Sequence, residues 1–308
     1  ARRFASGNGA PLDILLCENL MDADHLLRGL LQKALPPEFL DVLESKVGLV
    51  ETSIGRMVPV MTAGQKQEHP LLICAEPYSR LHVDAAAFKG PIPRIPSLEP
   101  VSPFRFYLER KLYLHNMGHC LTAYLGFMQG CTYIHEAIAR PEVRLYVQLA
   151  MEDAALALAE RHEQPVRPLL AHVDDLLYRF GNPALGDTVL RVGRDPIRKL
   201  APDDRLTGCA RMCLAQDMVP SWLLFGMAAA FRFIPEGDVQ SDTLQADLKQ
   251  FGLMECLHRY TGLQMEDPAA IAVHGAYTLQ AEEDALRKGI SWCEVIRKAG
   301  LEIGRASC

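Results

Sequence analysis

The pattern of apolar and polar positions changes its period near residue 104. Before that point, short apolar runs end in polar residues, which is typical of buried strands. Strands are predicted over residues 12–17, 47–58 and 71–76, and a helix over residues 24–35 ends at Pro36-Pro37. After that point the apolar positions follow a helical period almost without interruption. We expect helices over residues 104–129, 132–139, 141–162, 166–179, 204–217, 220–232, 241–260 and 268–299.

Prolines separate these two regions. Five of them, Pro91, Pro93, Pro96, Pro100 and Pro103, fall between the last predicted strand and the first long helix. Such density indicates a linker or an irregular crossover. We therefore expect two domains, an α/β part over residues 1–95 and an all-helical part over residues 96–308, so that the fold class is mostly α. A further helix is expected to restart at Asp195-Pro196, a good N-cap and first-turn pair.

The composition excludes several classes of protein. The 308 residues are 49% hydrophobic and 23% charged, which is ordinary for a globular chain. A net charge of −6 argues against nucleic acid as a partner. No apolar run reaches the roughly 18 residues that span a bilayer, so we expect no membrane partner. Nine cysteines without a C-x-x-C spacing indicate reduced, mostly buried thiols and a cytoplasmic protein.

The most informative chemistry lies in one helical segment. Lys111, Asn116 and His119 occur within the apolar, helix-compatible run that follows Glu109. At about 100° per residue, Asn116 lies roughly 140° and His119 roughly 80° from Lys111, so all three share one broad face. A lysine that can lose its proton, an amide that donates and an imidazole that orients a hydroxyl suit removal of a proton from an alcohol while hydride leaves its carbon. Alternatively, Lys111 is a surface residue of an amphipathic helix. An exposed lysine has a pKa of about 10.4 and is a poor base at neutral pH, so the catalytic role requires burial that lowers this pKa.

Three further motifs accompany this helix in a fixed order. They are Pro11-Leu-Asp-Ile-Leu-Leu-Cys-Glu-Asn-Leu20, Val47-Gly-Leu-Val-Glu-Thr-Ser-Ile-Gly-Arg-Met-Val-Pro59 and Arg191-Val-Gly-Arg-Asp-Pro-Ile-Arg-Lys-Leu200. Together with Lys111-x4-Asn-x2-His119 they resemble the mannitol dehydrogenase family of polyol-specific long-chain dehydrogenases, and the last motif is closest to its mannitol-phosphate branch. The resemblance runs from about residue 11 to about residue 280.

The resemblance implies a fold and a set of roles. The fold is the C-terminal part of a Rossmann-like α/β domain followed by a helical substrate domain like the C-terminal domain of 6-phosphogluconate dehydrogenase. The implied catalytic residues are Lys111 as general base, Asn19 and Asn116 as an oxyanion hole, and His119 as the residue that orients the substrate hydroxyl. Alternatively, Asn19 caps the helix that follows it.

The segment from Arg191 to Arg205 is rich in cations. Arg191 and Lys199 match a family pattern that lines the substrate site, and Arg194 and Arg198 suit a phosphate because guanidinium forks bind phosphate oxygens in pairs. A solvated charged turn with local ion pairs is the alternative for this segment.

One expected feature is absent from the sequence. A dinucleotide-binding domain normally contains a G-x-G-x-x-G turn between a strand and a helix, and this chain has none. Gly7-Asn-Gly9 has no strand before it, so it indicates a loop. We therefore expect the chain to comprise the end of the nucleotide domain and the whole substrate domain.

The predicted function is interconversion of a polyol phosphate and a ketose phosphate with NAD as cofactor, with mannitol 1-phosphate and fructose 6-phosphate as the expected pair. The alternatives are a free-polyol or uronate dehydrogenase of the same family, and a non-catalytic helical scaffold. His115 and His119 have the spacing of a zinc-binding pair, but the H-E-x-x-H glutamate is missing, so no metal is expected.

Overall fold

The computed structural model describes residues 1–18, 20, 22–59, 61 and 63–303, with only the backbone for residues 299–303. The chain divides into two compact units. The sheet unit consists of Ala1–Val58 and Ile73–Lys111, and the helical unit consists of Pro59–Leu72 and Leu112–Cys308. The domain boundary expected after residue 95 stays a prediction.

The sheet unit contains a four-stranded mixed sheet in the order β1-β2-β3-β4. Its elements are α1(Arg2–Ala5), β1(Leu12–Leu16), α2(Ala23–Ala34), η1(Pro37–Phe39), α3(Leu40–Lys46), β2(Val47–Ile54), β3(Leu81–Asp84), η2(Ala85–Ala87), β4(Leu98–Val101) and α5(Phe104–Arg110). The first half of β2 runs parallel to β1, and its last three residues pair antiparallel with β3. β3 and β4 are parallel.

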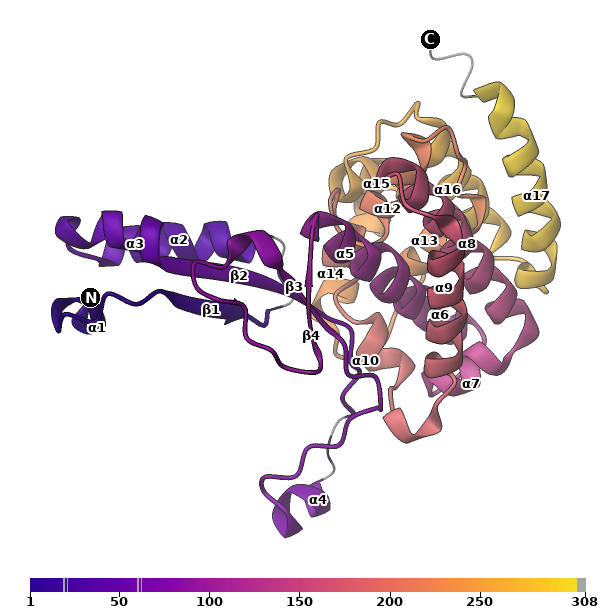
Figure 1. Ribbon diagram of the computed structural model, residues 1–308. Coiled ribbons are helices and arrows are strands. Elements are labelled where there is room, and N and C mark those ends of the chain that lie inside the picture. The colour runs from indigo at the N-terminus through magenta and orange to yellow at the C-terminus, as the bar shows by residue number, and fades with distance from the viewer. Residues whose placement is uncertain (19, 21, 60, 62, 304–308) are drawn as a thin grey trace. The chain divides into compact units, whose positions relative to one another are not determined.

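Each face of this sheet has its own apolar cluster. Helices α2 and α3 lie over one face, as Figure 1 shows, and Leu43 packs there with Val47 and Leu49. On the other face, Val50 and Val83 are fully buried and pack with the segment that follows β3. Because side chains alternate between the faces of β2, the apolar residues of its first half are buried on both sides of the sheet.

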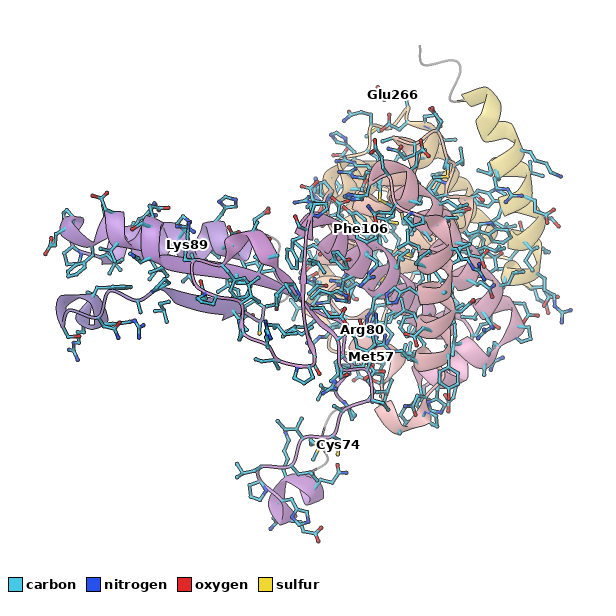
Figure 2. All side chains as sticks on the ribbon, in the orientation of Figure 1. Met57, Cys74, Arg80, Lys89, Phe106 and Glu266 are labelled. Carbon is cyan, nitrogen blue, oxygen red and sulfur yellow. The ribbon has the colours of Figure 1, made fainter. Side chains whose placement is uncertain are left out.

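A carboxylate ties β1 to the segment after η2. The backbone N–H of Lys89, a residue labelled in Figure 2, donates to Asp13 Oδ1 at 2.7 Å, and that of Gly90 donates to Asp13 Oδ2 at 3.1 Å. This explains the polar residue inside an otherwise apolar strand, because Asp13 satisfies two loop N–H groups.

The strand predicted over residues 71–76 is wrong. This segment has no regular structure, and β3 and β4 form the remaining strands instead. Leu71 and Ile73 are 96% and 75% exposed, so the apolar run has no face to bury. A run of five apolar residues carries no reliable period, which is why the pattern gives a false strand here.

The helical unit holds the remaining elements. These are α4(Ala63–Glu68), the π-helical turn η3(Lys111–Asn116), α6(Met117–Met128), α7(Ile134–Ala139), α8(Pro141–Arg161), α9(Val166–Phe180), η4(Pro183–Leu185), α10(Val189–Gly193), α11(Pro196–Leu200), α12(Thr207–Leu214), α13(Ser221–Phe231), α14(Val239–Phe251), α15(Leu253–Thr261), α16(Pro268–Leu279) and α17(Ala285–Ile303). The first residue of η3, Lys111, is the last residue of the sheet unit. A partial Rossmann sheet followed by a large helical domain is the predicted fold class, and it is confirmed.

Two predicted helices are each divided in the structure. The helix expected over residues 241–260 breaks at Gly252, which has φ of +77°. The helix expected over residues 268–299 breaks before Asp284, which has φ of +58°. Neither break strongly interrupts the helical period of the apolar residues, so the sequence pattern predicts one continuous helix in each case. The helix at Asp195-Pro196 forms as expected, but Asp195 is left-handed and its side chain does not cap it.

Helix α13 is the centre of the helical core. All eleven of its residues are buried, and it packs against α6, α8, α16 and α17. The close approach of α13 and α6 depends on Gly226, because a Cβ there would overlap Cδ2 of Leu121. The core therefore requires glycine at this crossing.

The cysteines and the helix lengths complete the description of the fold. The eight cysteines that the structure describes are all free, and five of them are buried. Within the described residues, no helix is both long enough and apolar enough to cross a bilayer.

Candidate functional site

The segment that carries the predicted lysine, asparagine and histidine is a continuous helix with an unusual centre. The α-helical turns of α5 lead into the π-helical turn η3, and α6 continues from Met117. The angles expected from an α-helix are therefore wrong. A π-turn closes i→i+5 hydrogen bonds, so Lys111 and Asn116 lie almost one above the other instead of far apart round the helix. The wider turn strengthens the shared face that the spacing predicted.

The predicted residues of this helix differ in exposure. Lys111, Asn116 and His119 are half-buried, whereas His115 is buried and its ring lies 5.8 Å from that of Phe180. The fourth predicted catalytic residue, Asn19, lies outside the described residues.

His119 is held from two sides within the helical unit. Its ring stacks on Phe180 of α9, with centroids 4.9 Å apart and planes 14° apart. Its Nε2 atom lies 3.3 Å from Oδ2 of Asp187, within hydrogen-bonding distance. Asp187 also forms an ion pair with Arg191, one turn further along the chain. The sequence predicted His119 and Arg191 as site residues, but it did not predict Asp187, the carboxylate that lies between them.

The surroundings keep the imidazole neutral. Burial lowers the pKa of His119 to about 3, and the positive charges of Arg191, Arg205 and Lys199 add to the effect. Although Asp187 lies beside the ring, we regard the pair as a carboxylate and a neutral imidazole, because the side chain is only 17% exposed and three cations oppose its protonation. A neutral ring can accept or donate a hydrogen bond but supplies no proton at neutral pH.

The predicted substrate-binding cations separate into buried and exposed groups. Lys199 is 3% exposed, and its Nζ donates to the carbonyl of Arg194. Burial lowers the pKa of Lys199 to about 8. Arg191 is 40% exposed and Arg194 67%, while Arg198 pairs with Asp204 at 3.3 Å. The two outer arginines are thus available to solvent, whereas Lys199 belongs to the interior.

Asp187 is the residue that the sequence reasoning missed. It is 6% exposed and lies just before α10. The N-cap of that helix is Thr188, whose side chain accepts a hydrogen bond from the backbone N–H of Arg191. The distance of Asp187 from His119 along the chain hides the partnership. The available signal was the Asp187–Arg191 spacing of one helical turn, which suggests an ion pair.

The crevice beside His119 is small and of mixed polarity. It is lined by His119, Ile134, His135, Phe180, Asn182, Leu185 and Asp187. In the described part of the chain, no three histidine, cysteine or acidic side chains gather closely enough to hold a metal ion.

Comparison with known proteins places this architecture among two-domain dehydrogenases. The model of the mannitol dehydrogenase Rossmann domain matches residues 1–97, and that of the mannitol dehydrogenase C-terminal domain matches residues 104–280. Together they cover most of the chain. The chain belongs to the mannitol dehydrogenase family.

Two similar curated proteins are both mannitol-1-phosphate 5-dehydrogenases. That of Caldanaerobacter subterraneus subsp. tengcongensis is 34% identical over 270 residues, which are 88% of this chain and 69% of the relative. That of Thermoanaerobacter pseudethanolicus is 35% identical over 254 residues, which are 82% of this chain and 65% of the relative. The chain thus spans about two thirds of the length of these relatives.

Two solved structures share the fold. A D-sorbitol dehydrogenase in substrate-free form superimposes with a TM-score of 0.75 at 17% identity, over 94% of this chain and 64% of that one. The Pseudomonas fluorescens mannitol 2-dehydrogenase, solved with NAD and D-mannitol, gives a TM-score of 0.70 at 18% identity, over 94% and 63%. At these identities the likeness concerns the fold.

Proposed function

We propose that the chain acts in the NAD-dependent interconversion of mannitol 1-phosphate and fructose 6-phosphate, the activity for which its curated relatives are named. The observation that carries the proposal is the immobilised, neutral His119 on the helix that also bears Lys111 and Asn116. Alcohol oxidation needs a proton acceptor, a donor to the oxygen and a group that orients the hydroxyl. This helix supplies one side chain suited to each task.

In the proposed mechanism these side chains handle the proton and the oxygen. Lys111 takes the hydroxyl proton, while NAD, when bound, would accept the hydride from the same carbon; Lys111 returns the proton when the ketose is reduced. The amide of Asn116, with that of Asn19, stabilises negative charge on the oxygen; such donors contribute about 3–4 kcal/mol in water-excluded sites. His119 orients the hydroxyl as a neutral imidazole, since its pKa is about 3.

The cations near His119 favour an anionic substrate. Lys199 is buried, and its Nζ donates to the backbone carbonyl of Arg194. Because a carbonyl has no net charge, this hydrogen bond does not neutralise the ammonium. The charges of Arg205 and Arg198 further lower the pKa of Lys199. An anionic ligand would relieve this repulsion, because opposite charge stabilises the ammonium. We therefore favour a polyol phosphate, with Arg191, Arg194 and Arg198 as further candidate ligands.

The described residues do not supply an evident site for the NAD diphosphate. Such a site normally lies where a parallel strand leads through glycines into a helix N-terminus. Helix α2 follows β1, but the N–H of Ala23 already bonds Glu51 Oε1 at 2.9 Å, and Asp24 lies in the first turn. Two carboxylates at this end repel a diphosphate. This misfit is the observation that favours the rival function, a non-catalytic helical scaffold.

The test is reduction of fructose 6-phosphate by the 308-residue chain, followed as NADH oxidation. Fructose and fructuronate are assayed beside it, because a free-polyol or uronate dehydrogenase would prefer one of them. Lys111→Ala is the informative variant, and Lys249→Ala, which removes an exposed lysine on α14, is the matched control. We expect turnover with the phosphate that Lys111→Ala lowers by at least about a hundredfold and Lys249→Ala leaves unchanged.

Other outcomes separate the rivals. Turnover with fructose or fructuronate alone would replace the substrate, and equal turnover by Lys111→Ala would remove the proposed base. No turnover with any ketose would overturn the proposal that this chain is an enzyme. Stabilisation of the chain against heat by fructose 6-phosphate alone would then identify a substrate-binding domain, and no stabilisation would leave the scaffold.

A further inference from the structure

We propose that Asp187 is a positioning residue that holds His119 in one orientation and one tautomer while it holds Arg191 in place. The inference deepens the proposed function and rests on it for its kinetic part. The geometry that carries it is a single buried carboxylate whose two oxygens serve different partners: Oδ2 faces His119 Nε2 at 3.3 Å, and Oδ1 pairs with Arg191.

The backbone around Asp187 is fixed independently of these partners. Its carbonyl accepts from the N–H of Ile134 at 2.9 Å, and Val189 N–H donates to Thr132 O at 2.9 Å. A single antiparallel bridge joins Thr188 to the start of α7. The carboxylate therefore stands on a braced segment between α7 and α10, as a group that orients another residue requires.

An ionised carboxylate accepts hydrogen bonds only. With Nε2 of the neutral His119 ring 3.3 Å from this carboxylate, the tautomer that carries its proton on Nε2 is favoured, and Nδ1 is left as the acceptor. Stacking on Phe180 prevents the ring from turning away. His119 is thereby prepared to accept a hydrogen bond from a hydroxyl through Nδ1, which is the role that orientation of an alcohol demands.

The ion pair with Arg191 gives the carboxylate its charge balance. A buried carboxylate between a neutral ring and solvent would be costly by itself, and the guanidinium offsets that cost. The same ion pair holds Arg191 beside the site, although its side chain remains 40% exposed. One side chain thus links the group that orients the hydroxyl to a cation proposed to bind the anionic part of the substrate.

The kinetic experiment is a double-mutant cycle of Asp187→Asn and His119→Asn in the fructose 6-phosphate assay. The change at Asp187 keeps the size of the side chain but removes its charge and its acceptor-only character. We expect Asp187→Asn to lower kcat by roughly 10–100-fold, by analogy with the loss when the outer partners of metal-binding histidines are removed. In the His119→Asn background the same change should cost less than about twofold. Asp187→Glu should restore part of kcat.

Asp175→Asn is the matched control. Asp175 also pairs with an arginine one turn away, Arg179 at 3.2 Å, in the same unit, but it does not contact His119. It should leave kcat unchanged. Multiplicative losses in the cycle, or an equal loss in Asp175→Asn, would overturn the positioning role.

A second measurement needs no turnover. Ring nitrogen NMR of histidine-labelled protein, with the His119 signals assigned from His119→Asn, should show one neutral Nε2–H tautomer from about pH 5 to about pH 9. In Asp187→Leu, which removes the acceptor but keeps the branched shape, both nitrogen shifts should move toward an average of tautomers, and in Asp175→Asn they should not. Unchanged shifts in a folded Asp187→Leu protein would overturn the inference. If the protein shows no turnover but the nitrogen shifts move as expected, the result would contradict only the proposed function.

Discussion

Asp153 allows a quantitative test of the helical core. It lies on α8, it is half-buried, and its Oδ2 is buried without a hydrogen-bond partner among the described residues. Burial raises the pKa of Asp153 from 3.8 to about 7, Arg297 opposes this rise, and Glu152 adds to it. Burial raises the pKa of the Cys209 and Cys293 thiols, and the charge of Asp153 adds to the rise for each.

The sign of the effect follows from where the proton is held. The folded chain keeps the Asp153 proton up to about pH 7, whereas the unfolded chain loses it near pH 4. Folding stability from this group is therefore greatest at low pH and falls as pH rises through this interval. The pKa difference sets an upper limit of about 4 kcal/mol above pH 7, and screening of a half-buried carboxyl reduces it to about 2 kcal/mol.

The perturbation is Asp153→Asn, which keeps the shape and removes the charge. Urea unfolding is followed by tryptophan fluorescence, since Trp222 and Trp292 are the only two tryptophans and both belong to the helical unit. We expect the stability advantage of the variant to grow by about 1–2 kcal/mol between pH 5 and pH 9. The exposed Asp174→Asn serves as control. A pH-independent difference between variant and parent would refute the reasoning.

Two further predictions concern packing and the proposed anion site. Gly226→Ala should lower the free energy of unfolding by about 1–3 kcal/mol, since its Cβ would overlap Leu121, whereas Gly275→Ala, whose Cβ would meet only ordinary contacts, should cost nothing by thermal unfolding. Binding of fructose 6-phosphate near pH 8 should take up a fraction of a proton, because an anion raises the pKa of Lys199 above about 8. Titration calorimetry in two buffers measures this uptake; fructose, or the Lys199→Met variant, should show none.

Much of the fold was accessible from the sequence because its signals are local. The helices of residues 104–180 and 207–231 follow from apolar periodicity and from prolines and glycines at their ends, whereas the short α10 was not predicted. The breaks at Gly252 and before Asp284 were not accessible, because a left-handed residue need not disturb the apolar period. Residues 71–76 failed for the opposite reason: the apolar run exists, but the fold gives it no partner.

The candidate site divides in the same way. Lys111, Asn116 and His119 were found because they lie on one helix, although the π-turn that aligns the first two has no compositional signal. Asp187 was not found because it meets His119 only through the packing of α6 against α10. Prediction of Asp187 as a site residue depends on the tertiary structure, which a short sequence motif does not reveal.

The structure also bears on which lysine is the better candidate for the base. Lys199, with a pKa near 8, could in principle release and take up a proton at neutral pH. Its Nζ, however, donates to the Arg194 carbonyl, and the side chain is 3% exposed, so a substrate hydroxyl would have to displace that bond in the interior. Titration of Lys199 should therefore change the affinity for an anionic substrate and appear in KM. A proton acceptor must instead act in kcat, and Lys111, half-buried on the helix that carries Asn116 and His119, is the lysine from which we expect that behaviour.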